Sequence, residues 1–312
     1  MRIYSIFDDF GKEPIKILKD AGIDIDIQPF GSERPNCNEM KKILEEYDGV
    51  IIGTSQKMEK EIFKNIKSPK IIATASVGVD HICIPEQKSE LITVLNTPKS
   101  NSQSVAEYTI GCALACSKRI IEGRILYSEG KNNKKLLQKP EDIYEKTLGV
   151  IGAGNISFKI MEYGKLLGVN IICWTFHPEK HESISKLGVK FVGLDELLQT
   201  ADIISVNLPD NERTKGLISE KKIQKIKDNA IFISVSRKDT CDYKALIKKA
   251  KKCPAFYMCL DLDIIDELVD DTLLIPNVII TPHIAGGTVN TRKKMFKEIA
   301  EKIVYFTNRK NK

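Results

Sequence analysis

His283 is the residue whose type and position most directly suggest chemistry. It follows the apolar run 278–280 and a Thr-Pro step, and the other histidines of the chain are His81, His177 and His181. An imidazole exchanges a proton near neutral pH. A lone histidine is more often structural, but a carboxylate that orients the ring and a nearby cation would favour an acid–base role.

Arg237 and two neighbouring acids are the candidates for those partners. Arg237 lies just past the predicted strand 230–234, and Asp266 and Glu267 follow a strand that ends at Asp261. The carboxyl ends of parallel strands meet at one edge of a sheet, where such folds bind their ligands. A guanidinium there can hold a planar anion through two parallel hydrogen bonds. If the three groups meet at that edge, an acid–base role for His283 is favoured; if they do not, a structural histidine is expected.

A glycine turn offers a second kind of chemistry. The apolar run 148–151 leads into Gly152 and Gly154, and a helix-like pattern follows. The amide groups and dipole of a helix beginning there attract a phosphate, which glycine lets approach the backbone closely. Ser157 occupies the third position of the G-x-G-x-x-G pattern, so the turn taken alone is a weak signal and an ordinary tight turn stays possible.

The elements that position these residues form two α/β series. In the first, strands and helices alternate, which predicts parallel pairing. Its predicted strands are 2–6, 23–28, 49–53, 70–74 and 92–96, and its predicted helices are 14–21, 38–47 and 57–66. Two strand-end loops, 54–56 and 76–80, face the expected ligand edge. The second is either an anion-binding nest around Gly78 or a simple turn.

Thr97-Pro98 marks a candidate hinge before the second series. A single long helix is expected over 102–121, a loop over 130–139, and a final helix over 289–306 with room to cross back to the first domain. The remaining predicted strands are 148–151, 169–174, 190–192, 203–207, 230–234, 256–260 and 278–281, with helices at 195–199, 220–226 and 243–252.

Composition excludes several classes of protein. A chain of 312 residues favours two domains. The net charge of +6 comes from scattered lysines without a dense basic block, so nucleic-acid binding is not expected. Eight dispersed cysteines fit a reducing compartment better than disulfides or a metal site. No signal peptide or membrane-length apolar run is visible, so a cytoplasmic protein is expected.

The motifs, taken together and in order, resemble the D-isomer-specific 2-hydroxyacid dehydrogenases over nearly the whole chain. They are residues 76–81, 101–107, 148–156, 201–209, 214–218, 235–237, 260–262 and 277–287. The resemblance implies a Rossmann-type NAD(P)-binding domain, 99–284, inserted into a discontinuous flavodoxin-like substrate domain, 1–98 and 285–312. The helix 102–121 is similar to the family's dimerisation region, which implies a homodimer.

The resemblance also implies an activity, that of an NAD(P)-dependent D-2-hydroxyacid dehydrogenase or 2-oxo acid reductase with a glyoxylate- or hydroxypyruvate-like substrate. Arg237 then grips the substrate's carboxylate and keto oxygen, and His283 exchanges the proton. The partner of His283 falls on Asp266, five residues past Asp261, with Glu267 as the alternative. Expected substrate-binding residues are Ser55, Val77, Gly78 and Arg237. No metal is implied.

The implied cofactor is NAD or NADP. Its expected contacts are Gly152, Gly154, Asn155, Ile156, Thr175, His177, Asn207, Leu208, Pro209, Thr214, Val235, Ser236, Asp261 and Gly286. Thr175 stands where the family has an acid that repels a 2′-phosphate. His177 or Lys180 can attract that phosphate, but no arginine stands ready to clamp it. The choice stays open, and NADPH is expected to support activity at least comparably to NADH.

Four departures from the family pattern keep other functions in view: Ser157 and Lys238 in place of glycines, Asp266 in place of a glutamate, and Thr175 in place of an acid. Phosphoglycerate oxidation is the nearest alternative. A dinucleotide-sensing interaction protein without turnover is a second, and phosphite or formate oxidation on the same fold is a third.

Overall fold

The computed structural model describes residues 1–131, 139–262 and 275–310. The chain folds as two compact units, each built around its own sheet. The first unit comprises Met1–Asn101 and Thr288–Lys312, and the second comprises Ser102–Gly287. Both are layered α/β structures with parallel sheets, which confirms the fold class predicted from the alternation of strands and helices.

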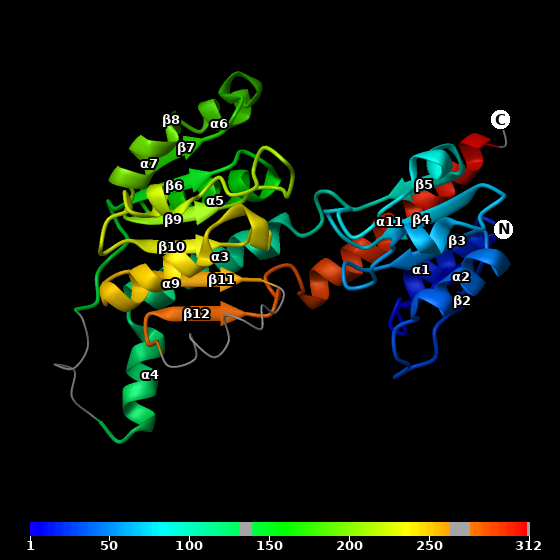
Figure 1. Cartoon of the computed structure of the whole chain (residues 1–312), viewed down its shortest axis with the longest axis horizontal. Helices are drawn as coiled ribbons and strands as arrows, with labels where there is room; N and C mark the ends of the chain where they lie inside the picture. Colours follow the sequence, from blue (N-terminus) through cyan, green and yellow to red (C-terminus); the bar gives the residue numbers. More distant parts are fainter. Residues whose placement is uncertain (132–138, 263–274, 311–312) are drawn as a thin grey trace. The chain divides into compact units, whose positions relative to one another are not determined.

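The sheet of the first unit has five parallel strands in the order β2-β1-β3-β4-β5 (Figure 1). This is the flavodoxin-like order. The strands are β1 (Arg2–Ser5), β2 (Asp24–Ile27), β3 (Gly49–Ile52), β4 (Lys70–Thr74) and β5 (Ile92–Leu95). Every residue of β3 and β4 is buried, because helices cover both faces of a parallel sheet.

The helices of the first unit are α1 (Lys12–Asp20), α2 (Cys37–Glu46) and the terminal α11 (Val289–Lys310). The terminal helix packs beside α1. The ring centre of its Phe296 lies 4.8 Å from that of Phe7 and 4.9 Å from that of Phe10, two residues that precede α1. The last helix of the chain therefore belongs to the same compact unit as the first strands.

The predicted helix 57–66 is wrong. The structure has a short 3₁₀ turn, η1 (Lys60–Phe63), because Met58 is extended and pairs with the backbone of Ile82. The amide of Met58 donates to the carbonyl of His81, and the amide of Cys83 donates to the carbonyl of Met58, each at 2.8 Å. Those long-range bonds hold the start of the segment outside a helix, which local periodicity cannot reveal.

The sheet of the second unit has seven parallel strands in the order β12-β11-β10-β9-β6-β7-β8. They are β6 (Thr147–Ile151), β7 (Asn170–Trp174), β8 (Lys190–Phe191), β9 (Ile203–Val206), β10 (Ile231–Ser234), β11 (Tyr257–Asp261) and β12 (Val278–Thr281). Numbered within this unit, the order is that of a Rossmann sheet with one added edge strand. The strand order reverses beside β6, at the point where such sheets bind dinucleotides.

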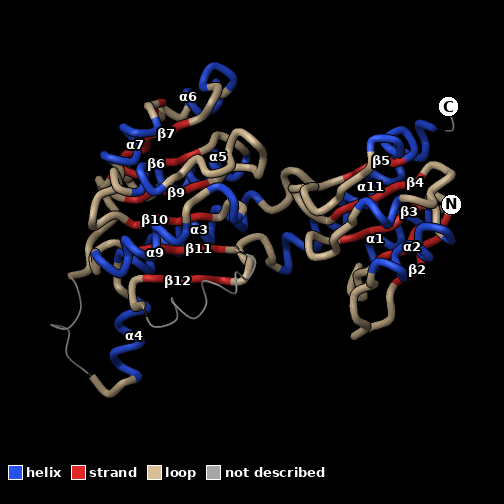
Figure 2. Tube along the Cα trace, viewed as in Figure 1, coloured by secondary structure: helices blue, strands red, loops and turns tan. Residues whose placement is uncertain are grey.

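Helices lie on both faces of this sheet (Figure 2). Apolar side chains of α7 and α9 fill one core cluster, and those of α3 and α5 fill the other. The helices are α3 (Ser102–Ser117), α4 (Ile120–Ser128), α5 (Asn155–Leu166), α6 (Glu182–Lys186), α7 (Leu194–Thr200), α8 (Glu220–Ile223) and α9 (Tyr243–Lys252).

The long helix predicted over 102–121 is two helices, α3 and α4. Arg119 separates them with a left-handed backbone, φ 56°, a conformation that interrupts a helix. Its buried guanidinium lies over the ring of Tyr257, 4.0 Å from the ring centre. Within the described residues, no helix has the length and apolar character needed to cross a membrane.

Candidate active site

Arg237 is positioned by the end of β10, whose four residues are all buried. The hydroxyl of Ser236, one residue earlier, accepts a hydrogen bond of 2.7 Å from the amide of Leu208. The carbonyl of Arg237 accepts one of 2.8 Å from the hydroxyl of Thr240. These two hydrogen bonds fix the backbone at Ser236 and at Arg237, from which the guanidinium extends.

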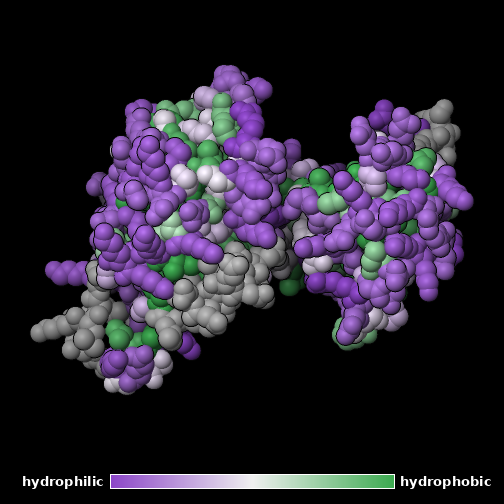
Figure 3. Space-filling model, viewed as in Figure 1, coloured by the Kyte–Doolittle hydropathy of each residue, from purple (hydrophilic) through white to green (hydrophobic). Residues whose placement is uncertain are grey.

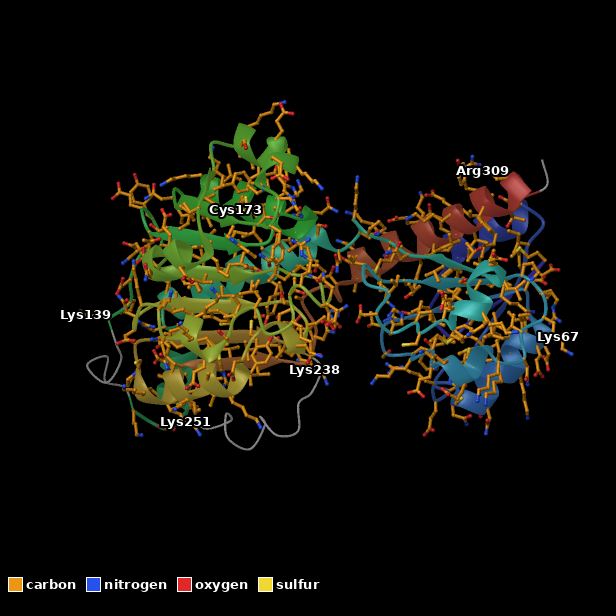
Figure 4. The ribbon with its side chains drawn as sticks, turned by 45° about the horizontal axis from the view of Figure 1, so that its top comes forward. Lys67, Lys139, Cys173, Lys238, Lys251 and Arg309 are labelled. Carbon is orange, nitrogen blue, oxygen red and sulfur yellow. The ribbon has the colours of Figure 1, made fainter. Side chains whose placement is uncertain are left out.

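Lys238 replaces the glycine expected after Arg237, and the structure explains why a side chain is tolerated there. Lys238 begins a short 3₁₀ turn, η5 (Lys238–Thr240), and its φ is not positive. Its side chain lies exposed on the surface of the second unit (Figure 4). The backbone at this position does not require glycine.

His283 stands on a strained turn beyond β12. Its φ is 53°, in the left-handed region that residues other than glycine rarely adopt, and its amide donates to the carbonyl of Thr281 at 2.9 Å. Such a conformation costs about 1–3 kcal/mol and persists where the surroundings over-determine it. Strain of this kind often marks a functional site.

Asp261 provides that over-determination. One carboxylate oxygen of this buried residue accepts hydrogen bonds from the hydroxyl of Thr281 at 2.6 Å and the amide of Ile284 at 2.8 Å. The other oxygen accepts the amide of Ala285 at 2.8 Å. Asp261 therefore holds the loop that carries His283, and its predicted contact with a cofactor stays a prediction.

Helix α3 supports the same loop through residues whose role sequence reasoning missed. The hydroxyl of Ser104 donates to the carbonyl of Ala285 at 2.6 Å, and the hydroxyl of Tyr108 lies 2.6 Å from that of Thr281. Burial raises the pKa of Tyr108, so this phenol stays neutral. Ser104 belongs to the sequence motif 101–107, which could have drawn attention to it. The motif alone does not reveal that Ser104 bonds to Ala285.

The structure brings Arg237 and His283 together. Nη1 of Arg237 lies 3.4 Å from Nε2 of His283, although the residues come from the ends of different strands. A fixed cation and a proton carrier thus share one edge of the sheet. Asp266 and Glu267, the predicted partners of His283, lie outside the described residues.

The glycine turn between β6 and α5 has the geometry of a phosphate cradle. Gly152 has φ 105°, and a Cβ there would lie 2.6 Å from the carbonyl oxygen of Asn207. Gly154 precedes α5 without a side-chain cap, and a Cβ there would meet no atom within 4 Å. The first glycine is required by close packing, whereas the second keeps space open in front of the helix N-terminus. This open space fits the pyrophosphate of a dinucleotide.

The loop after β9 lies against this turn. The amide of Asn207 donates to the carbonyl of Ile151 at 2.9 Å. The hydroxyl of Thr214 donates to the carbonyl of Pro209 at 2.6 Å and accepts from the amide of Asn211 at 3.1 Å, which closes the loop on itself. These predicted cofactor residues thus follow the strand next to β6.

Ser157, which replaces the third glycine, is completely buried. It lies in the first turn of α5, the helix that packs against α3. Within the described part of the chain, no hydrogen-bond partner contacts its hydroxyl. The structure therefore accommodates this departure inside the protein, away from the open space at Gly154.

The end of β7 corrects one expectation from the sequence. An arginine does stand near Thr175: the guanidinium of Arg213 lies 4.3 Å from the ring centre of Phe176, with Nη1 3.3 Å from Nε2 of His177. Nδ1 of His177 lies 3.3 Å from a carboxylate oxygen of Glu179. Arg213 is 36 residues from His177 in sequence, so only the fold brings them together.

In the first unit, side-chain hydrogen bonds to two carbonyl groups hold the loop after β4 in place. The hydroxyl of Ser76 donates to the carbonyl of Gly78, and the side-chain amide of Asn96 donates to that of Val77, both at 2.7 Å. The described residues provide no acceptor for the amide N–H groups of Val77 and Gly78. Successive amide N–H groups without an acceptor in the protein can bind an anion. Ser55 is exposed on the loop after β3.

The chain is similar to known proteins in sequence and in fold. A family model described as "D-isomer specific 2-hydroxyacid dehydrogenase, NAD binding domain" matches residues 110–285. The chain is 34% identical to a hydroxypyruvate reductase of Thermotoga maritima over 276 residues, 87% of this chain and 89% of that protein.

Two further proteins align with most of this chain. A D-3-phosphoglycerate dehydrogenase of Archaeoglobus fulgidus is 30% identical over 96% of this chain, but the match spans 56% of that protein. The solved D-lactate dehydrogenase of Aquifex aeolicus, complexed with NAD and lactic acid, superposes with a TM-score of 0.81 at 26% identity. That match covers 99% of this chain and 96% of the other.

Proposed function

The chain belongs to the D-isomer-specific 2-hydroxyacid dehydrogenase family, whose members are NAD-dependent oxidoreductases, and we propose that it works mainly as a reductase of small 2-oxo acids. Glyoxylate and hydroxypyruvate are the proposed substrate type. The observation that carries the proposal is the 3.4 Å approach of the Arg237 guanidinium to the His283 imidazole.

Arg237 and His283 divide the chemistry between them. The Arg237 guanidinium binds the substrate's carboxylate and orients the adjacent carbonyl. Bound reduced nicotinamide supplies the hydride that reaches the carbonyl carbon. The His283 imidazolium delivers a proton to the carbonyl oxygen, and Asp266, or Glu267 in its place, stabilises the charged ring.

The dinucleotide is proposed to lie along the edge formed by the ends of β6, β7, β9 and β10. Gly152 and Gly154, with the amides of Asn155 and Ile156, are proposed to hold the pyrophosphate. The remaining contacts are proposed for Thr175, His177, Asn207, Leu208, Pro209, Thr214, Val235, Ser236, Asp261 and Gly286. In this scheme residues 99–284 form the cofactor-binding domain.

For the first unit, we propose that Val77 and Gly78 bind a carboxylate through their amides and that Ser55 contributes to substrate selection. The residue ranges 1–98 and 285–312 then form the substrate-binding domain. The support is the pair of amides that find no acceptor among the described residues.

We also propose a cytoplasmic homodimer that binds neither nucleic acid nor membrane. No residue of α4 is buried, and Ile120 and Tyr127 are 59% and 75% exposed. Apolar residues gather over α4 on the surface (Figure 3). A second copy of the chain would cover these side chains in a two-fold symmetric contact.

A substrate panel tests the function. Glyoxylate, hydroxypyruvate and phosphohydroxypyruvate are each supplied with NADH and with NADPH, and oxidation of the reduced nicotinamide is followed. The unphosphorylated acids should react, with NADPH at least comparable to NADH, and Arg237→Ala and His283→Ala should abolish turnover. Preference for the phosphorylated acid would favour phosphoglycerate chemistry. Formate and phosphite are each supplied with NAD⁺ and with NADP⁺ in a separate assay, and reduction of the nicotinamide there would indicate a different hydride donor.

The panel also distinguishes an enzyme from a dinucleotide-sensing protein. A sensor would bind the cofactor and turn over none of the acids. The short distance between Arg237 and His283 argues against that alternative, because a sensor has no use for a proton carrier beside a carboxylate-binding cation.

A further inference from the structure

We infer that Arg213 selects a dinucleotide carrying a 2′-phosphate, so that the chain binds NADP(H) in preference to NAD(H). The inference rests on the proposed use of a nicotinamide dinucleotide and deepens it. It is carried by the contacts of Arg213 with Phe176 and His177 just past the end of β7.

The position of these residues matches that of the adenosine ribose. In a Rossmann sheet, the residue after the second strand contacts the ribose hydroxyls, and an acid there excludes a 2′-phosphate. The second strand is β7, and Thr175 follows its last residue, Trp174. A threonine hydroxyl carries no charge that repels a phosphate.

Contacts with Phe176 and His177 hold the Arg213 guanidinium in place. The central carbon of this guanidinium lies over the ring of Phe176, 4.3 Å from the ring centre, which is a cation–π contact. One Nη atom lies 3.3 Å from the imidazole of His177. A guanidinium has five N–H donors in a fixed fork, so one contact with His177 leaves other donors that can bind a phosphate.

His177 acts as a positioning residue for this arginine. The pKa of the Glu179 carboxyl is lowered, chiefly by a hydrogen bond with its own backbone, so the carboxylate is an acceptor at neutral pH. Glu179 therefore places the ring proton on Nδ1, 3.3 Å away, which leaves Nε2 to accept from Arg213.

The test uses the adenine half of the cofactor, so it needs no hydride transfer. Binding of 2′,5′-ADP and of ADP is measured by calorimetry. The wild-type chain should bind 2′,5′-ADP at least about tenfold more tightly than ADP, as expected for charge-assisted hydrogen bonds to the extra phosphate. Arg213→Ala should remove this difference and leave ADP binding within about twofold.

Matched variants separate the arginine from general charge. Lys215→Ala removes an exposed cation from the same loop and should leave the 2′,5′-ADP preference intact. Thr175→Asp should reverse the preference by adding the acid that repels the phosphate. His177→Ala should weaken 2′,5′-ADP binding in the wild-type background and have no further effect in Arg213→Ala, because it acts through the arginine.

Equal binding of the two ligands by the wild-type chain would overturn the inference, as would an Arg213→Ala variant that keeps the preference. Failure of the proposed function looks different. An inactive chain that still prefers 2′,5′-ADP would leave this inference standing, whereas an active reductase that prefers ADP would refute it alone.

Discussion

Among single residues, Arg237 is proposed to act through the planar fork of its guanidinium and not only through its charge. Arg237→Lys should lower kcat/KM for 2-oxo acids by about a hundredfold or more, because an ammonium cannot hold a carboxylate in a two-pronged bond. Steady-state kinetics with the best substrate of the panel measures this loss.

The neighbouring residue supplies the control for that prediction. Lys238→Gly restores the glycine expected by sequence but changes a position whose φ is not positive. Its kcat/KM should stay within about twofold of the wild type, since the guanidinium next to it is untouched. A comparable loss of kcat/KM in Arg237→Lys and Lys238→Gly would show that the loss comes from a disturbed turn at Lys238–Thr240 and not from the missing guanidinium.

Asp261 is predicted to act through the shape of the His283 loop. Asp261→Asn leaves an NH₂ group facing an N–H donor, so it should lower the free energy of unfolding by about 1–3 kcal/mol and also lower kcat. Urea denaturation and kinetics measure the two effects.

Asp239→Asn is the matched control, because within the described residues the Asp239 carboxylate has no hydrogen-bond partner. It should change neither the free energy of unfolding nor kcat. An Asp261→Asn variant that behaves like this control would contradict the positioning role of Asp261.

At the scale of elements, the two glycines of the β6–α5 turn are predicted to do different things. Gly152→Ala should destabilise the protein by more than about 1 kcal/mol, since the new methyl would lie 2.6 Å from the carbonyl of Asn207 at a positive φ. Gly154→Ala meets no atom within 4 Å, so it should fold normally but bind dinucleotide more weakly.

Thermal unfolding without ligand and dinucleotide titration separate these outcomes. Equal melting temperatures together with equal affinities in the two variants would refute the division of roles. A loss of affinity in Gly154→Ala alone, with its melting temperature unchanged, would identify the open space as the pyrophosphate site.

Sequence reasoning predicted the elements that local patterns specify. Apolar runs such as 278–281 reproduce β12, and the charged helix pattern 243–252 reproduces α9. It was wrong where long-range contacts override periodicity, as at Met58, and where Arg119 turns left-handed without a glycine or proline to signal the break.

The same limit applies to the site. That His283 and Arg237 lie close together could be predicted, because each follows a recognisable strand of one parallel sheet. Arg213 could not, because its neighbour His177 lies 36 residues away in sequence and the pair exists only after β7 and the loop after β9 fold together. The hydrogen bonds that hold the His283 loop also come from separate elements, which no spacing reveals.

At the scale of the whole molecule, the exposed helix α4 is predicted to mediate dimerisation. Replacing Ile120 and Tyr127 together with aspartate should convert a dimer into a monomer, because both side chains are mostly exposed in the single chain. Light scattering after size-exclusion chromatography measures the mass.

Leu166→Asp is the control for that prediction, since Leu166 is 84% exposed at the end of a different helix. It should leave the dimer intact. A wild-type chain that is monomeric at micromolar concentrations, or a dimer unaffected by the α4 variant, would contradict the proposal.

We propose that the chain reduces a 2-oxo acid to the D-hydroxy acid with hydride from a reduced nicotinamide, while Arg237 binds the substrate and His283 donates the proton. The most direct measurement is chiral analysis of the product formed from hydroxypyruvate and reduced cofactor by the wild-type chain and by Arg237→Ala. We predict D-glycerate as the product and its loss in the variant. L-glycerate, or no glycerate from a folded chain that binds dinucleotide, would contradict the account.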